Sequence, residues 1–412
     1  MTSETQPLAP GPPPDGGLKA WLQVLGAHFL FFNSWGLVNT FGVFQTYYES
    51  SLLRAESSSA ISWIGTFQAF LLVASSVVVG PLFDRGYFRP LIVCGTFLTV
   101  FGMMMVSLTD KYYQVFLAQG LCIGLGTGMI FLPSFAIVST YFTSKRAAAI
   151  GIVASGGSVG SVIYPIVFER LQAKIGFPWT VRVMGFLALA TLAVSIGTMR
   201  ARLPPAREAR PMLDLTAFRS APFMFFGFAL FFAFVGLYVP IFYIISWGQV
   251  RVHLEQNLSF YMLSVLNGAS VFGRILPALL ANKFGALELL IANCCFAGVL
   301  AFVATVIKNL GGLVAFAILY GFVSGTVVSL PGAVVASLAP SLDLVGTWMG
   351  MSFCFSALGV LIGNPIAGLI IDVGQDKFNG GFIFAGAFIL AGAAMLTLAR
   401  LSKTPAMKEW QT

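Results

Sequence analysis

One arginine lies well inside a long apolar stretch of this 412-residue sequence. Arg274 is part of Val271-Phe272-Gly273-Arg274-Ile275-Leu276-Pro277, within the apolar run 258–280. A charge in a membrane span costs about 2.5 kcal/mol or more, so such a residue usually faces a cavity or a partner. Its planar guanidinium suits an anion with two oxygens. The alternative is that the side chain reaches the membrane surface or pairs with a helix end.

Polar side chains elsewhere in the apolar runs are candidates for the wall of the same cavity. Amides and hydroxyls near the middle of long apolar helices can line a binding site between them. We therefore expect a substrate-binding set made of Arg274, Asn39, Asn33, Ser270, Asn267 and Asn364.

Residues for catalysis or for a metal are not indicated. The sequence has two histidines and no Walker motif, and its five cysteines all lie in apolar runs, where small buried side chains are expected. We expect no catalytic residue, no metal ligand and no cofactor, so the protein is not predicted to be an enzyme.

The composition predicts the elements that position these residues. The sequence is 58% hydrophobic and 9% charged, with a mean hydropathy of +0.88, whereas soluble domains have about 25% charged residues. Forty-four glycines without period-2 alternation favour packed helices over a barrel. The predicted fold class is an all-α membrane protein. The net charge of +8 lies mostly in loops, where it indicates membrane orientation rather than a nucleic-acid partner.

Twelve apolar runs are long enough to cross the roughly 30 Å core of a bilayer as helices. We predict twelve transmembrane helices in two six-helix halves, 19–199 and 221–400, joined by the basic linker 200–220. Polar tails are predicted at 1–18 and 401–412. The runs are 20–46, 60–83, 90–108, 113–139, 147–168, 179–199, 221–246, 258–280, 286–306, 311–336, 344–371 and 379–400.

The distribution of positive charge predicts the orientation. If the amino terminus is cytoplasmic, the cytoplasmic segments hold fourteen lysines and arginines and the opposite face holds seven. Positive residues accumulate on the cytoplasmic side, so both termini are expected there. The segment 1–18 is polar and rich in proline and lacks the apolar core of a signal peptide, which predicts a disordered tail.

Three motifs carry a family resemblance. The charged turn Gly80-Pro81-Leu82-Phe83-Asp84-Arg85-Gly86-Tyr87-Phe88-Arg89, together with the two-half layout, resembles the major facilitator superfamily of secondary transporters. Asp15-Gly16-Gly17-Leu18-Lys19-Ala20-Trp21, continued by Asn39-Thr40-Phe41-Gly42-Val43-Phe44-Gln45, is similar to the entry of its fungal monocarboxylate-porter branch. Tyr141-Phe142-Thr143-Ser144-Lys145-Arg146-Ala147-Ala148-Ala149-Ile150-Gly151 is similar to the second signature of that branch. The resemblance covers nearly the whole chain.

The charged turn is a candidate gate. Acids and bases at the ends of helices can form ion pairs that latch the two halves in one state. We hypothesise a latch between Asp84 and Arg146, and the alternative is that these charges only solvate the membrane surface. The predicted gating residues are Asp84, Arg85, Arg89 and Arg146.

The fifth apolar run has small residues at spacings of three to five. Such spacing lets the backbone of a neighbouring helix pack closely or slide. The residues of this predicted packing face are Gly151, Ser155-Gly156-Gly157 and Gly160-Ser161.

The resemblance also implies a role for Arg274. An arginine at this place in the eighth helix of the family binds the substrate carboxylate. Ser270 and Asn39 replace an acid and a lysine that the mammalian members use for proton-coupled lactate uptake, so that coupling is not expected here.

The predicted function is secondary transport of organic acids or amphipathic small metabolites by alternating access. Efflux of a fungal secondary metabolite is one form that the resemblance suggests. The alternatives are a general multidrug exporter of the same fold and a non-transporting nutrient sensor. The expected partners are a small organic anion or secondary metabolite and membrane lipid, an ancillary protein is left open, and the expected location is the plasma membrane.

Overall fold

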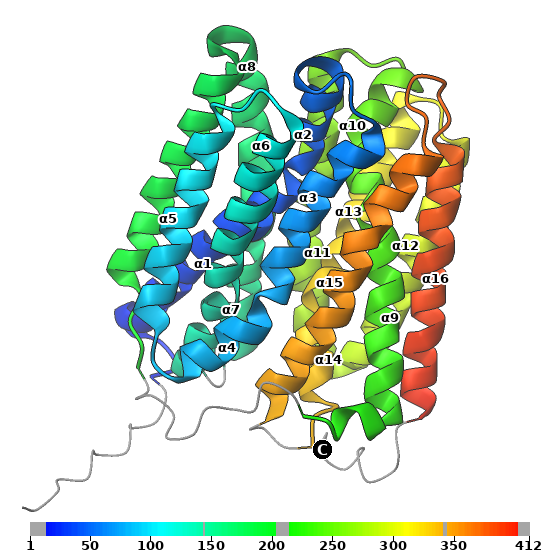
Figure 1. The fold of residues 1–412 in the computed structure, drawn as a ribbon. Helices are drawn as coiled ribbons and strands as arrows, with labels where there is room; N and C mark the ends of the chain where they lie inside the picture. The colour runs from blue at the N-terminus through cyan, green and yellow to red at the C-terminus, as the bar shows by residue number, and fades with distance from the viewer. Residues whose placement is uncertain (1–13, 143–144, 203–213, 341–343, 403–412) are drawn as a thin grey trace, which may run out of the picture.

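The computed structural model describes residues 14–142, 145–202, 214–340 and 344–402. The described residues are mostly helical, and their one β feature is an isolated bridge between Asp372 and Lys377. Figure 1 shows two helical bundles side by side, the first coloured blue to green and the second green to red.

The first bundle is built from eight α-helices as the structure divides them. They are α1 (Gly17–Asn39), α2 (Phe41–Tyr47), α3 (Ser58–Ala74), α4 (Ser76–Asp84), α5 (Phe88–Val106), α6 (Tyr112–Val115), α7 (Gly124–Tyr141) and α8 (Arg146–Thr198), with the π-helical turns η1 (Tyr48–Leu52) and η2 (Phe116–Ile123).

The second bundle follows the linker and begins with a short 3-10 turn. Its elements are η3 (Ala217–Arg219), α9 (Ala221–Leu237), α10 (Val239–Val250), α11 (Gln256–Phe284), α12 (Ala286–Val303), η4 (Ala304–Val306), α13 (Leu310–Ser329), α14 (Pro331–Ala336), α15 (Val345–Ile370) and α16 (Asn379–Leu401).

Ten helical segments of the described chain are long and apolar enough to cross a membrane. One of them contains two predicted spans, because α8 is interrupted at Gly176, whose φ of 75° lies in the left-handed region that favours glycine. The predicted runs 147–168 and 179–199 lie on either side of this break. The first predicted run, 20–46, corresponds to α1 and α2, which meet at Thr40. These segments together account for the twelve transmembrane helices in two halves.

Helix α8 packs against α1 with their backbones in contact. A Cβ atom at Gly156 would lie 2.2 Å from the carbonyl oxygen of His28, and one at Gly160 would lie 2.4 Å from that of Phe32. The His28 ring nitrogen Nδ1 donates to the carbonyl oxygen of Ile152 at 2.8 Å across the same contact. The close packing predicted for the fifth span is confirmed at these two glycines.

The second half repeats this arrangement between α9 and α15. A Cβ atom at Gly359 would lie 2.3 Å from the carbonyl oxygen of Phe231, and one at Gly363 would lie 2.1 Å from that of Val235. In each half, therefore, glycines on the fifth span bring it into backbone contact with the first span. This shared device is what an internal repeat of the two halves predicts.

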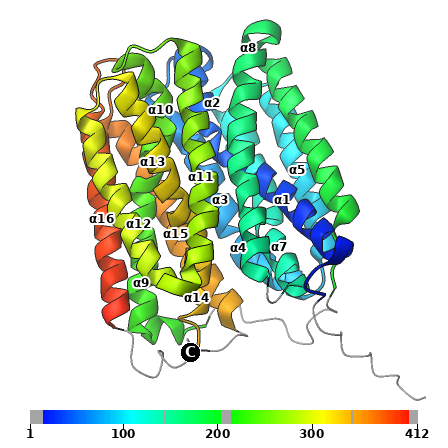
Figure 2. The same cartoon turned by 180° about the vertical axis from the view of Figure 1, so that it is seen from behind.

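The two halves meet along two helix pairs, α3 with α15 and α8 with α11, as Figures 1 and 2 show. At the first pair, the Ser59 hydroxyl donates to the carbonyl oxygen of Pro365 at 3.0 Å. At the second pair, the hydroxyls of Ser158 and Ser270 lie 2.8 Å apart. At these two helix pairs the halves thus contact each other through serine hydroxyls, and no ion pair joins the halves among the residues that the structure describes.

Each end of the basic linker is fixed to a different half. The backbone N–H of Arg200 donates to Gln23 Oε1 at 2.8 Å in the first half, and the Trp348 indole donates to Asp214 Oδ2 at 2.9 Å in the second. Hydrogen bonds from the Thr216 hydroxyl and from the Trp348 indole lower the pKa of Asp214 from its ordinary value. We call this end of the bundle the linker face. The end at which α3 begins and α15 ends is the far face.

Candidate functional site

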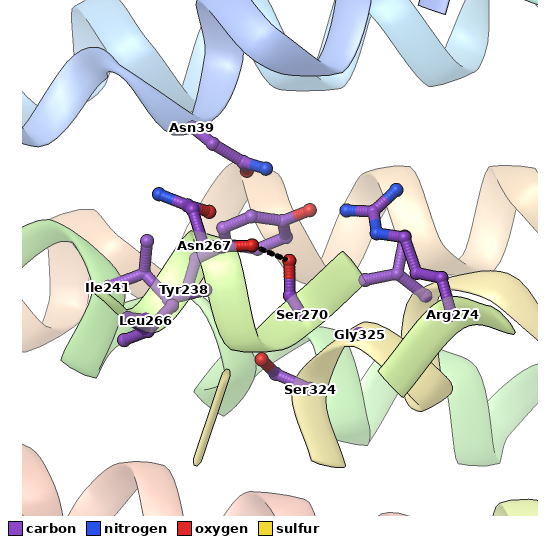
Figure 3. A pocket seen from close by; sticks show the side chains of 10 residues that line it. Asn39, Tyr238, Ile241, Leu266, Asn267, Ser270, Arg274, Ser324 and Gly325 are labelled. Carbon is purple, nitrogen blue, oxygen red and sulfur yellow. Dashed lines mark hydrogen bonds between the residues drawn. The ribbon is translucent and has the colours of Figure 1, made fainter. Parts of the chain in front are cut away.

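A small polar cavity lies between the halves, with a volume of about 10 Å³. A volume of this size holds about one water molecule, so the two halves must separate before a metabolite can enter. Figure 3 shows its side chains, which come from α1, from the junction of α9 and α10, and from α10, α11 and α13. The lining residues are Asn39, Tyr238, Ile241, Leu266, Asn267, Ser270, Arg274, Ser324, Gly325 and Val328.

Helix α11 presents three of the predicted site residues on one face. Asn267, Ser270 and Arg274 are spaced by three and four residues, which places them in a row along a helix. All three face α8 of the other half. The Asn267 amide donates to the carbonyl oxygen of Ser161 at 3.3 Å, and Arg274 Nη1 donates to that of Ala154 at 3.5 Å.

Arg274 is 3% exposed and has no carboxylate partner among the residues that the structure describes. Its Nε–H has no hydrogen-bond partner there either, and its one described hydrogen bond is the long contact with Ala154. A buried charge without compensation destabilises the fold and favours binding of an opposite charge. An anion beside the guanidinium would supply the compensation that the described residues lack.

Other unpaired polar atoms surround the same place. Asn39 Oδ1, the Tyr238 hydroxyl and the Trp35 indole N–H are buried and have no hydrogen-bond partner within the described part of the chain. Most buried polar atoms in proteins are hydrogen-bonded, so a cluster of exceptions needs a reason. A ligand that brings its own oxygens and donors would supply the missing partners.

The structure brings together four of the six predicted binding residues, and the other two lie outside the cavity. Asn33 is paired within the first half, where it donates to Thr191 Oγ1 at 2.8 Å and accepts from the Tyr164 hydroxyl at 2.6 Å. Asn364 is 1% exposed on α15 and does not line the cavity, although its amide atoms have no partner among the described residues. The substrate role of all six residues stays a prediction.

The predicted gating residues lie at the linker face. Asp84 ends α4 and Arg146 begins α8. The structure describes the backbone of these two residues but not their side chains. Arg85 and Arg89 are exposed. The latch between Asp84 and Arg146 therefore stays a prediction.

A second cavity, of about 320 Å³, opens at the far face between the halves. The Gln45 amide donates to Glu49 Oε1 at 3.0 Å beside it. Sequence analysis gave Glu49 no role because this residue follows the end of the first predicted run. The lining residues are Thr46, Glu49, Ser50, Glu56, Ser58, Ser246, Gln249 and Val373.

Trp35 lies beside the site, and the sequence analysis did not identify it. It lies in α1, four residues before Asn39 and on the same helix face. That spacing is the signal that could have identified it, since a tryptophan in an apolar run gives no other sign of function.

Two helical halves around a polar cavity near the middle of the bundle define a secondary transporter that works by alternating access. Residues 24–341 match the family model of the Major Facilitator Superfamily, and the chain belongs to that superfamily. It is similar to the MFS-type transporter dbaD of Emericella nidulans, with 46% identity over 87% of this chain and 80% of the relative.

Two other relatives have names that state a cargo. The aspyridones efflux protein apdF of Emericella nidulans is 38% identical over 88% of this chain and 74% of its own length. The agnestins efflux protein AgnL12 of Paecilomyces divaricatus is 38% identical over 90% of this chain and 85% of its own. Among solved structures, the nucleoside transporter NupG has the same fold, with a TM-score of 0.69 and 14% identity over 94% of this chain and all of that one.

Proposed function

We propose that this transporter exports small organic acids or amphipathic metabolites with an anionic group, and that Arg274 binds that group. The observation that carries the proposal is a buried arginine without an ionic partner in the described structure, in a cavity between the halves. Relatives named for efflux of aspyridones and agnestins support the direction and the kind of cargo. The motifs that resemble the monocarboxylate-porter branch support an acid as the cargo.

The proposed transport cycle opens the cavity to one face at a time. Opening toward the linker face admits the substrate, and its anionic group takes the place beside Arg274 that Ala154 now contacts. Opening toward the far face then releases it. The basic charge of the linker supports a cytoplasmic linker face with both termini on that side. Export from the cell would place the protein in the plasma membrane. Membrane lipid would cover the exposed apolar sides of the helices, and no catalytic step is part of the proposal.

The test uses yeast that expresses the protein and is loaded with a mixture of organic acids. Retention of each acid in the cells is measured by mass spectrometry. We expect the wild-type chain to lower the retention of a subset of acids. Arg274→Gln should abolish this effect, and Arg274→Lys should reduce it at least about tenfold because lysine lacks the bidentate fork.

A second arginine provides the matched control. Arg182 lies in α8 after the break at Gly176. Its Nε donates to the Ser107 hydroxyl at 3.0 Å, and its guanidinium lies over the Trp179 ring. Arg182→Lys should export the same acids as the wild-type chain. If both Arg274 variants export like the wild-type chain at equal membrane abundance, the substrate role of Arg274 is refuted.

One observation favours a second candidate, the general multidrug exporter. Glu49 lies half-buried at the end of the first span and lines the far cavity with Glu56. Acidic groups in such a place suit cationic compounds. Export of cationic drugs that is lost in Glu49→Gln and retained in Arg274→Gln would favour this candidate over the organic-acid exporter.

A further inference from the structure

Two aromatic rings from opposite halves are stacked beside the polar cavity. The rings of Trp35, on α1, and Tyr238, between α9 and α10, have centroids 6.1 Å apart and planes 10° from parallel. Both residues are buried. Phe131 of α7 meets Trp35 edge-on and also contacts Phe353 of α15. An aromatic row therefore crosses the interface between the halves at the level of the site.

This row is adjacent to the unpaired arginine. A Cβ atom at Gly157 of α8 would lie 2.9 Å from Trp35 Cβ and 3.5 Å from Arg274 Nη1, so one glycine separates the two side chains. Tyr238 and Arg274 line the same cavity. An aromatic surface and a guanidinium thus lie within the reach of one small molecule.

Both stacked residues also carry an unused hydrogen-bonding group. The Trp35 N–H and the Tyr238 hydroxyl have no partner among the described residues. A buried donor left without a partner costs free energy that a bound oxygen would recover. The pair can therefore offer a ligand both a ring surface and hydrogen bonds to oxygen substituents.

We propose that the substrate carries a planar conjugated ring next to its anionic group, and that the ring binds against Trp35 and Tyr238 with a phenolic or keto oxygen facing their polar atoms. This inference rests on the proposed role of Arg274 and narrows the substrate class to oxygenated aromatic acids. When the halves move apart by about one ring thickness, roughly 3.5 Å, the stack opens into a slot that a flat group fills and a puckered saturated ring does not.

Trp247 is a second buried tryptophan, and it lies away from the cavity. Trp247 is also buried with an unpartnered N–H among the described residues, but it packs against Phe316 and Phe382 inside the second half. It faces neither the interface nor the cavity lining. Trp247→Phe is therefore the matched control.

The experiment measures binding to the purified full-length protein in lipid nanodiscs by equilibrium dialysis. The probes are 6-hydroxy-2-naphthoate, 2-naphthoate and decahydro-2-naphthoate, which share a carboxylate and a similar size. We expect the wild-type chain to bind 6-hydroxy-2-naphthoate about tenfold more tightly than the saturated acid. Trp35→Leu and Tyr238→Leu should bring this ratio close to one, and Trp247→Phe should leave it unchanged.

Conservative variants separate the ring from its polar atom. Trp35→Phe and Tyr238→Phe should keep the preference for the flat naphthoates but lose the advantage of the 6-hydroxy group. They also keep the test decisive if the leucine variants fail to fold. Arg274→Gln should weaken the binding of all three acids by the same factor, because they share the carboxylate.

The outcomes distinguish the two proposals. Equal binding of flat and saturated acids by the wild-type chain, or no binding of the naphthoates, overturns the aromatic slot. A preference that survives in all four Trp35 and Tyr238 variants also overturns it, while weakening by Arg274→Gln leaves the organic-acid proposal in place. If Arg274→Gln changes no affinity, the proposed function fails instead.

Discussion

Arg274 is expected to destabilise the fold of the substrate-free protein. It is 3% exposed, it lies in an apolar span, and its described contacts do not include an acid that would offset the charge. A structural arginine would be expected to stabilise the fold through its partners. A functional arginine is expected to cost stability until the substrate arrives, and the two roles therefore predict opposite effects of removing it.

We predict that Arg274→Met raises the thermal stability of the substrate-free protein while abolishing export. Replacing even a buried ion pair by apolar side chains is often neutral or stabilising by about 1–4 kcal/mol, and removal of Arg274 leaves no described acid unpaired. The measurement is the midpoint of thermal unfolding in detergent, with Arg182→Met as a control that should lower it by removing the contacts with Ser107 and Trp179. A drop in the midpoint for Arg274→Met would support the packing role.

Some site residues could be predicted from sequence and others could not, for a physical reason. Arg274, Asn267 and Ser270 share one helix, so spacing alone places them together. Asn33 and Asn39 share a helix too, yet Asn33 is paired with Tyr164, which is more than a hundred residues away in the sequence. No local pattern reveals which buried amide finds a partner within its own half.

At the scale of elements, contact between α1 and α8 depends on individual glycines rather than on a small-residue stripe as a whole. The predicted packing face included Gly151, Gly156 and Gly160 alike. The structure shows open space around a Cβ atom at Gly151, whereas one at Gly160 would lie 2.4 Å from the carbonyl oxygen of Phe32. Sequence spacing gave the face correctly but could not say where the neighbouring helix crosses it.

This difference makes Gly160→Ala and Gly151→Ala a matched pair of substitutions. Gly160→Ala should destabilise the protein by about 1–3 kcal/mol, because the added methyl forces α1 away from α8. Gly151→Ala should be neutral or slightly stabilising, since alanine favours a helix where nothing is displaced. Thermal unfolding midpoints and the yield of folded protein measure both effects. Equal midpoints for the two variants would contradict the packing that the structure shows.

At the scale of the whole molecule, α3 and α2 of the first half contact α15 and α10 of the second half beside the far cavity. The Ser59 hydroxyl bonds to the backbone of α15, and a Cβ atom at Gly42 would lie 3.2 Å from the carbonyl oxygen of Phe242. The count of twelve spans and the division into halves could be predicted from sequence because apolar length records them. The contacts between the halves at the far face could not, since they join residues that are far apart in the sequence.

Alternating access predicts that the contact between α3 and α15 at the far face must open during transport. A Cβ atom at Gly368 of α15 would lie 3.0 Å from the Cα atom of Ser59 on α3, close enough for a disulfide in a Ser59→Cys, Gly368→Cys variant that lacks the five native cysteines. Oxidation should stop export almost completely, and dithiothreitol should restore it, because the bond joins helices that alternating access must separate.

A cross-link within one half is the control for this lock. A Cβ atom at Gly26 would lie 2.7 Å from the Thr198 hydroxyl, and both residues belong to the first half. Oxidation of a Gly26→Cys, Thr198→Cys variant should leave the export rate near that of the reduced form, because a half that moves as a rigid body tolerates an internal tie. Export that continues through the oxidised Ser59 and Gly368 pair would mean that α3 and α15 stay together at the far face throughout the cycle, and the substrate would then need a path that does not separate the halves there.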